Sequence, residues 1–329
     1  MNRLCKRQWI ASTLGLLVFG LTLLSPVVHG QEYPTKPIQI VFPFPPASGG
    51  DIVSRLVGEK VASILGQPVL VVNKPGAGGA LGVHAVKAAP ADGHTILLSP
   101  PPVLLLPIAT KDIGYTLADF IPINLVGRNP SVLVVKRDAP WTTMDQLIAD
   151  AKKNPGKFGF GSAGLGTSGH FAVALLNMET GAEFLHVPMK GEAPVATAIA
   201  GGHIHTSIIG LVSARSQLQA GNLRALAVTS PEGTTELPNV PSTAAIGYRS
   251  IEVSPWFIFF VRANTPPNIV GKLGKVFNQA LQDKGLVERV ENVGIVVQNR
   301  GPEETAKFLE QENKKWSHVG RLANIRATN

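Results

Sequence analysis

The sequence predicts an α/β fold of two lobes with a mixed, mainly parallel sheet in each lobe. Short apolar runs alternate with helical patterns in two successive series, which is typical of parallel strands joined by crossover helices. Glycine-rich loops follow several of these runs, and 329 residues are enough for two domains. We expect 31–125 and 256–329 to form lobe 1, 126–255 to form lobe 2, and a ligand to bind in the cleft between them.

The N-terminal segment has the pattern of a secretory leader. Basic residues precede the apolar run Ile10–Leu24, and Val28–Gly30 offers a cleavage site. The run is shorter than the ~20 residues of a membrane span. The one cysteine, Cys5, precedes the run, whereas a lipid-modified cysteine would follow it. We therefore predict that residues 1–30 are a signal peptide cleaved near Gly30 and that the mature chain is periplasmic.

The charge of the mature chain favours small anions as ligands. The whole chain has 30 basic and 22 acidic residues, a net charge of +8. Three basic residues and no acidic ones lie in the leader, which leaves 27 against 22, or +5. The remaining basic residues are scattered and are not interleaved with aromatic residues, so we exclude a nucleic-acid partner. A mildly basic field attracts small anions instead.

Two strand–loop–helix units open the mature chain. The first is the strand Ile38–Phe42, the loop Pro43–Gly50 and the amphipathic helix Asp51–Leu65, with Asp51 placed to cap the helix. The second unit is the strand Pro68–Val72, the loop Asn73–Gly79 and the helix Ala80–Ala89. A third strand, Thr95–Leu98, follows and ends at Ser99–Pro102.

A second series begins near Val126. The expected strands are Val132–Val135, Phe158–Gly161, Phe184–Pro188, Thr206–Ile209 and Ala225–Thr229, and the helices are Met144–Asn154, Thr167–Thr180 and one that follows Lys190–Pro194 and ends at Ala200. A hydrophobic crossing, Ser254–Val261, precedes two amphipathic helices, Pro266–Leu281 and Pro302–Leu322. We expect this C-terminal part to return to lobe 1.

Two glycine-rich loops are candidate anion sites. Asn73–Gly79 and Ser162–His170 each join a strand to a helix, where glycines let backbone N–H groups approach a ligand and the helix dipole adds positive charge. A tight turn without a ligand is the alternative for the first loop. No Walker motif is present, because neither Gly156-Lys157 nor Gly271-Lys272 is followed by Ser or Thr.

The second loop also has weaker enzyme interpretations. Gly164, Gly166 and Gly169 match the dinucleotide spacing, but Glu183 precedes the next strand instead of ending it. A serine hydrolase would use Ser168 and His170, although the nucleophile motif fails at its last position. His170 could hydrogen-bond an anion or only cap the loop.

A metal site is not expected. His203 and His205 would share one face of a strand, but no third ligand stands near them, so a structural role is favoured. The sequence has no HExxH motif, no paired cysteines and no calcium loop. We expect no cofactor, no metal and no catalytic site.

The mature chain resembles the periplasmic receptors of the tripartite tricarboxylate transporter family, often called Bug proteins. The motifs that carry the resemblance are Tyr33-Pro34, Lys36–Ile38, Asn73–Gly79, Pro90–Thr95, Asn154–Lys157, Ser162–His170, Val187–Gly191, Leu223–Ala227 and Leu237–Pro241. The resemblance implies a two-lobed periplasmic-binding-protein fold of the Venus-flytrap, type II-like kind. It also implies capture of a small carboxylate and its delivery to membrane permease subunits, without chemistry.

The family's ligand-facing loops correspond to Pro43–Asp51, Asn73–Gly79, Ser99–Pro102, Ser162–His170 and Lys190-Gly191. The ligand-binding residues that the resemblance implies are Phe44, Ala47, Ser48, Gly49, Asp51, Asn73, Gly76, Ala77, Gly78, Ser99, Pro100, Ser162, Ala163, Gly164, Thr167, Ser168, His170, Lys190 and His205. Of these we expect Ser162, Thr167 and Ser168 to be direct donors, with Asn73 and Gly78 facing them. Asp51 is expected to act as a cap more than as a contact.

Three features of the sequence depart from the family pattern. Ala47-Ser48 replaces a usual Gly-Gly, Met189 replaces a tyrosine, and His205 stands where an aspartate is common. An aspartate could pair with a ligand amine, and a neutral histidine would not. We therefore expect a mono- or dicarboxylate without a free amino group, bound by a monomer. A sensor that passes its ligand to a membrane histidine kinase, and the exported hydrolase, are the alternatives.

Overall fold

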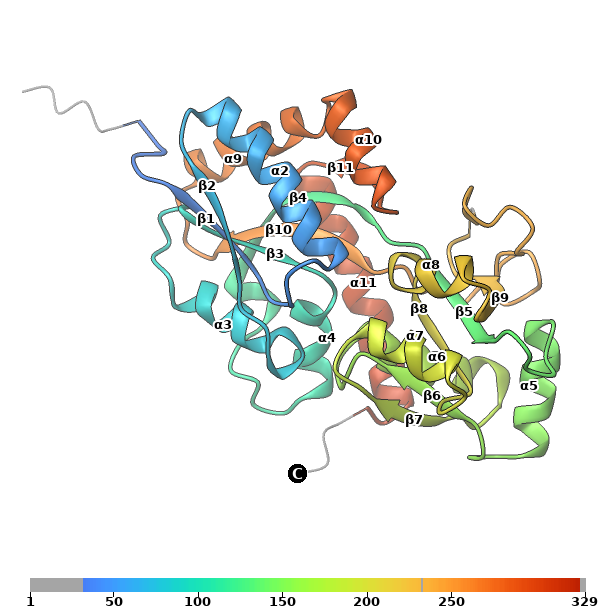
Figure 1. The fold of residues 1–329 in the computed structure, drawn as a ribbon. Helices are drawn as coiled ribbons and strands as arrows, with labels where there is room; N and C mark the ends of the chain where they lie inside the picture. The colour runs from blue at the N-terminus through green and yellow to red at the C-terminus, as the bar shows by residue number, and fades with distance from the viewer. Residues whose placement is uncertain (1–31, 232, 326–329) are drawn as a thin grey trace, which may run out of the picture. The chain divides into compact units, whose positions relative to one another are not determined.

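The first of two sheets combines strands from both ends of the chain. The computed structural model describes residues 32–231 and 233–325, so the predicted signal peptide lies outside the described residues. The strand order in this sheet is β11-β4-β10-β3-β1-β2 (Figure 1). The strands are β1 Ile38–Phe42, β2 Val69–Asn73, β3 Thr95–Ser99, β4 Phe120–Arg128, β10 Trp256–Arg262 and β11 Val296–Arg300.

The strand directions make this sheet mixed. β1 pairs in parallel with β2 and β3, whereas β10 runs antiparallel to both β3 and β4, and β11 runs antiparallel to β4. Four strands therefore share one direction. The central strand β10 is apolar on both faces, with Trp256, Phe259 and Phe260 fully buried, because helices cover both sides of it.

Two groups of helices cover the first sheet. α2, α9 and α10 pack on one another, and α3, α4 and α11 pack on the other side (Figure 1). The bounds are α2 Gly49–Leu65, α3 Ala80–Ala88, α4 Pro102–Ala109, α9 Pro267–Ala280, α10 Lys284–Asn292 and α11 Pro302–Leu322, with short 3₁₀ turns at Ala77–Gly79 and Leu117–Asp119.

The second sheet is built from the middle of the chain in the order β7-β6-β8-β5-β9. Its strands are β5 Ser131–Lys136, β6 Gly159–Ser162, β7 Leu185–Pro188, β8 Thr206–Gly210 and β9 Leu223–Val228, and its helices are α5 Met144–Lys153, α6 Ser168–Thr180, α7 Glu192–Ala200 and α8 Leu211–Gln219. Only β5 runs against the other strands. The prediction of two mixed sheets is confirmed, but the sheets are not mainly parallel, because β10 and β11 in the first sheet and β5 in the second pair antiparallel with their neighbours.

The C-terminal part of the chain returns to the first sheet through β10, which lies between β3 and β4. The chain leaves the first sheet at Arg128, the last residue of β4, and enters the second sheet at Ser131, the first residue of β5. By contacts, Lys36–Asn329 forms one unit that contains both sheets. The lobe boundaries stated above stay a prediction.

Several local predictions were wrong. α2 begins at Gly49 with Ser48 as its N-cap, two residues before the expected start, and Asp51 lies inside the first turn. The sequence patterns gave no sign of α4, β4, α8, α10 and β11. β4 contains Pro122, which cannot donate to a ladder and stands where the register with β10 shifts. α8 follows β8 without a loop, and Gly210 is both the last residue of the strand and the N-cap of the helix.

Candidate functional site

The predicted ligand loops lie at the carboxyl ends of parallel strands. In the first sheet they follow β1, β2 and β3, which are adjacent and point the same way. In the second sheet they follow β6 and β7, which pair with each other in parallel. Loops at the carboxyl ends of such strands are the usual ligand sites of open α/β sheets.

Glycine loops from the two sheets touch each other. A Cβ atom added to Gly78 would stand 3.2 Å from the carbonyl oxygen of Leu165, and one added to Gly166 would stand 2.4 Å from the Leu106 side chain of α4. Both glycines have left-handed backbone, with φ of 64° and 69°. Only glycine fits this approach, so these two glycines allow loops from the two sheets to lie in contact.

The start of α6 offers hydrogen-bond donors at this junction. Thr167 is the N-cap and Ser168 the first residue of the helix, so the first-turn N–H groups have no partner within the helix. The Thr167 hydroxyl donates to the carbonyl of Gly164 at 2.7 Å and so shapes the loop. Among the described residues, the Ser168 hydroxyl has no hydrogen-bond partner, which leaves it as a donor for an anion.

Ser162 is held inside the loop by a histidine that the sequence analysis missed. Ser162 is 1% exposed, and its Oγ lies 2.6 Å from Nε2 of His186 and 3.2 Å from the Gly164 N–H, which donates to it. His186 stands in register with Phe160, two residues before Ser162 on the neighbouring strand. The two-residue period of the strands would have placed both side chains on one face, but the strand register was not known from the sequence.

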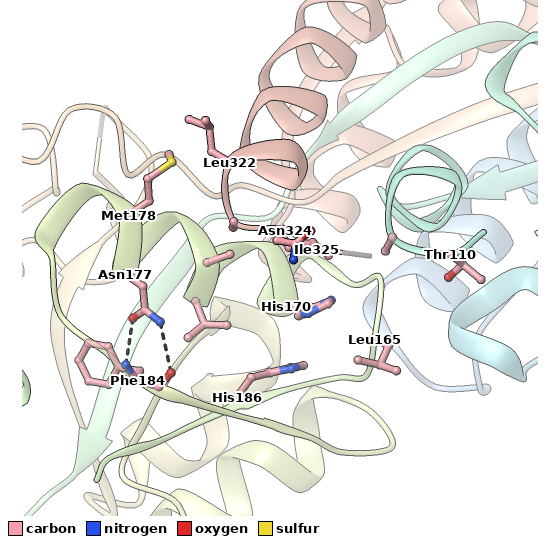
Figure 2. Close-up of a pocket in the computed structure, with 14 residues that line it drawn as sticks. Thr110, Leu165, His170, Asn177, Met178, Phe184, His186, Leu322, Asn324 and Ile325 are labelled. Atoms are coloured by element: carbon pink, nitrogen blue, oxygen red, sulfur yellow. Dashed lines mark hydrogen bonds between the residues drawn. The ribbon is translucent and has the colours of Figure 1, made fainter. Parts of the chain in front are cut away.

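His186 also stacks on His170, with ring centroids 4.4 Å apart (Figure 2). Burial lowers the pKa of His170, and burial together with the charge of His170 lowers the pKa of His186 to about 4. Both rings are therefore neutral at pH 7. His170 accepts a hydrogen bond at Nδ1 from the Gly166 N–H, so it braces the loop.

A pocket of about 550 Å³ runs beside these histidines along one face of α6 (Figure 2). Of the predicted ligand residues it includes His170 only. Its other lining residues are Ala109, Thr110, Leu165, Val173, Ala174, Asn177, Met178, Phe184, His186 and Leu322–Ile325.

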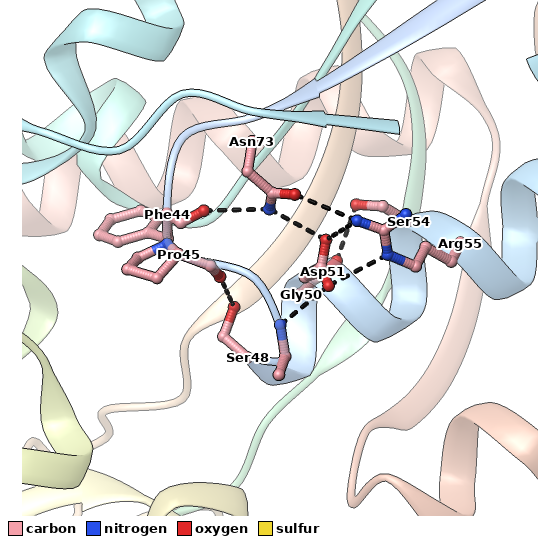
Figure 3. Close-up of polar contacts among 9 residues, drawn as sticks. Phe44, Pro45, Ser48, Gly50, Asp51, Ser54, Arg55 and Asn73 are labelled. Atoms are coloured by element: carbon pink, nitrogen blue, oxygen red, sulfur yellow. Dashed lines mark hydrogen bonds and ion pairs between the residues drawn. The ribbon is translucent and has the colours of Figure 1, made fainter. Parts of the chain in front are cut away.

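The loop after β1 is braced by a polar network centred on Asp51 (Figure 3). The buried Asp51 carboxylate accepts hydrogen bonds from the Ala47 N–H, from Arg55 and from Nδ2 of Asn73 at 2.9 Å. Burial by itself would raise the pKa of Asp51, but the hydrogen bonds from Arg55, Ala47 and Asn73 outweigh it and hold the pKa below its usual value.

Asn73 holds the loop after β1 in place through its side-chain hydrogen bonds. Its Nδ2 donates to the Phe44 carbonyl and to Asp51, and its Oδ1 accepts from Arg55. With both amide hydrogens used, Asn73 has no donor left for a ligand. The expectation of a direct Asn73 contact therefore finds no support in the geometry. Asp51 holds the same loop through Ala47 and Asn73 and does not cap α2, whose N-cap is Ser48.

The remaining first-sheet residues line the same strand ends. Ala47 has left-handed backbone with φ of 62°, Ser48 Oγ donates to the Pro45 carbonyl, and the buried Ser99 Oγ donates to the Pro100 carbonyl. Phe44 and Gly76 lie in the loops after β1 and β2, Ala77 begins the 3₁₀ turn Ala77–Gly79, and Gly49 is the first residue of α2.

Of the second-sheet residues, Ala163 and Gly164 belong to the loop of Ser162. Lys190 is exposed directly after Met189, whose N–H donates to the Ser162 carbonyl at 2.9 Å, so this loop also lies beside Ser162.

His205 lies away from the other predicted residues. It precedes β8, and its Nδ1 accepts from the N–H of Gly159, the first residue of β6. The Ser162 loop follows the opposite end of β6, about 10 Å along the strand at ~3.3 Å per residue. The structure therefore does not bring His205 to the ligand loops, and the argument from His205 against an amine loses its basis.

Metal chemistry and membrane crossing find no support in the described part of the chain. No group of three or more His, Cys, Asp or Glu residues there is arranged to hold a metal ion. Within the same residues, each helix is too short or too polar to span a bilayer.

Comparison with known proteins identifies relatives over nearly the whole chain. Residues 53–325 match the model of the tripartite tricarboxylate transporter family receptor. Protein BugT of Bordetella pertussis is 34% identical over 315 residues, which is 95% of this chain and 96% of BugT.

Two solved structures share the fold. The periplasmic binding protein BugD is 30% identical with a TM-score of 0.79, covering 90% of this chain and 100% of BugD. The R. palustris protein Rpa4515, solved with adipate, is 29% identical with a TM-score of 0.81, covering 89% of this chain and 99% of Rpa4515. The expected periplasmic-binding-protein fold is therefore confirmed.

Proposed function

The chain belongs to the tripartite tricarboxylate transporter receptor family, and on that basis we propose that it captures a small organic carboxylate between its two sheets and delivers it to membrane permease subunits. The ligand site comprises the loops after β1, β2, β3, β6 and β7. The receptor acts in the periplasm after removal of its leader, as a monomer and without chemistry.

One observation carries the proposal. The Gly78 and Gly166 loops, which come from different sheets, meet at the unpaired N–H groups that begin α6. An anion held there would gain backbone and hydroxyl donors and the positive end of the helix dipole. The adipate complex of Rpa4515 supports a carboxylate as that anion.

The donors on the second sheet are Ser168 and the first-turn N–H groups of α6. Thr167 and Ser162 shape the loop, because their hydroxyls already bond Gly164 and His186. Gly78 supplies the facing wall. Since backbone groups dominate, ordered waters are expected to complete the contacts with the carboxylate.

A thermal-shift screen across organic acids tests the proposal. A ligand that binds only the folded state raises the free energy of unfolding by about 2.7 kcal/mol at a hundredfold excess over its Kd. We expect at least one small carboxylate to raise the melting temperature in a saturable manner, and calorimetry to give one site per chain. No shift with any acid would contradict the proposal.

The hydrolase alternative has little support in the geometry. Nδ1 of His170 is occupied by the Gly166 N–H, and the serine that does meet a histidine is the buried Ser162. Turnover of carboxylic esters that is lost on Ser168→Ala would establish the hydrolase. The sensor alternative keeps the same ligand site, and binding of the purified protein to permease subunits or to a histidine kinase separates the two.

A further inference from the structure

A partly buried carboxyl group lies at the ligand end of the second sheet and has no counter-charge. Glu192 begins α7, and its Oε2 accepts from the Ser213 hydroxyl at 2.8 Å and from the Gly210 N–H at 3.3 Å. Among the ion pairs of the described residues, none includes Glu192. Burial raises the pKa of this carboxyl, although the two hydrogen bonds oppose the rise.

Beside Glu192 lies a buried acceptor that has no hydrogen-bond partner. Asn129 is 6% exposed, and its Oδ1 has no hydrogen-bond partner. A Cβ atom added to Gly210 would stand 2.2 Å from Asn129 Nδ2 and 3.1 Å from Glu192 Oε2, so both side chains converge over this glycine. Buried polar atoms are nearly always paired, and the unpaired Asn129 acceptor next to a carboxyl group without an ion-pair partner indicates a missing donor.

The position of Glu192 places it among the ligand loops. It follows β7 at the same end of the sheet as the Ser162 loop follows β6. Its partner Ser213 adjoins Val212, whose Cγ1 is 3.5 Å from the Cβ position of Gly49, the first residue of α2. Glu192 is thus fixed to the turn of α8 that meets the first-sheet loop.

We propose that Glu192 binds an ammonium group of the ligand, so that the receptor takes amino acids or closely related aminocarboxylates. An ammonium supplies the missing counter-charge and three N–H donors, which suit Oε1 of Glu192 and Oδ1 of Asn129. The ligand carboxylate then binds the start of α6. This inference rests on the proposed function, and it replaces the expectation of an amine-free ligand that His205 had suggested.

Calorimetry with matched pairs of acids tests the inference. The pairs are aspartate and succinate, glutamate and glutarate, leucine and 4-methylpentanoate, and phenylalanine and 3-phenylpropanoate. We expect the amino member of the tightest pair to bind at least about tenfold more tightly than its partner, as for loss of a charged hydrogen bond. Glu192→Gln should reduce that preference to within about twofold.

The variants separate charge from structure. Glutamine keeps an oxygen for the Gly210 N–H and the Ser213 hydroxyl, so Glu192→Gln should keep the fold, which thermal unfolding checks. Glu183→Gln, at an exposed position, is the matched control and should leave the preference unchanged.

Three results would overturn the inference. Wild-type protein that binds the amine-free acid as tightly as its amino partner refutes it and leaves the proposed function standing. Equal weakening of both members by Glu192→Gln also refutes it. Failure of all these acids, and of the wider carboxylate screen, to bind the wild type refutes the proposed function and the inference together.

Discussion

The contact between the glycine loops of the two sheets can be tested by adding one methyl group. Gly78→Ala places a Cβ 3.2 Å from the Leu165 carbonyl oxygen, tighter than ordinary van der Waals contact, so the two loops must separate by a few tenths of an ångström. Gly66→Ala is the matched control, because Gly66 has φ of 65° against 64° at Gly78 and its added Cβ meets nothing within 4 Å.

The two variants share the cost of left-handed backbone and differ only in the contact. That cost is about 1–2 kcal/mol, so urea unfolding should show a similar loss of stability in both. Only Gly78→Ala should weaken ligand binding. The affinity should fall about tenfold if separating the loops costs ~1.4 kcal/mol in the bound state. Calorimetry with the best acid from the screen gives the affinities. Equal affinity of the two variants would refute the idea that this contact forms the ligand site.

Three further predictions concern individual side chains. Asp51→Ala should lower stability by about 1.5–3 kcal/mol at pH 7. Because the folded-state pKa of Asp51 is lowered, this contribution is complete above pH 3.8 and is lost at lower pH, so urea unfolding at pH 3 should show a smaller difference from wild type. The pKa of His186 is about 4 in the folded protein and 6.5 in the unfolded chain, so the wild type should lose stability as the pH falls from 6.5 to 4. His186→Asn should make stability depend less steeply on pH over this range. An unchanged pH dependence would contradict the burial of His186 as a neutral group. Thr167→Ala with Ser168→Ala should weaken carboxylate binding about tenfold or more by calorimetry, and a change within twofold would exclude these hydroxyls.

Local patterns predicted much of the fold. β1 has the expected bounds Ile38–Phe42, and α11 the expected bounds Pro302–Leu322, because apolar periodicity and flanking prolines are properties of the sequence itself. β4 and α8 were missed, since Pro122 argues against a strand and a single residue, Gly210, joins β8 to α8. These elements exist because neighbouring strands and helices bury them.

The site was predicted less completely than the fold. Glycine-rich loops after strands are a local pattern, and in the structure the loops of Gly78 and Gly166 lie in contact. The roles within those loops depend on partners far along the chain: Asn73 bonds Asp51, 22 residues away, and Ser162 bonds His186, 24 residues away. Without the strand register, the sequence could not show that Asn73 hydrogen-bonds Asp51 or that the His186 ring contacts the Ser162 hydroxyl.

The sequence by itself determined the alternation of strands and helices, the leader pattern, the family resemblance and the glycine loops, because each depends on neighbouring residues. Only the tertiary structure decided which side chains share the carboxyl end of the parallel strands. It placed His205 at the far end of β6 and brought Glu192, Asn129 and Gly210 together. The physical reason is that charge and hydrogen-bond pairing act across space, and strand order and direction fix which distant residues meet.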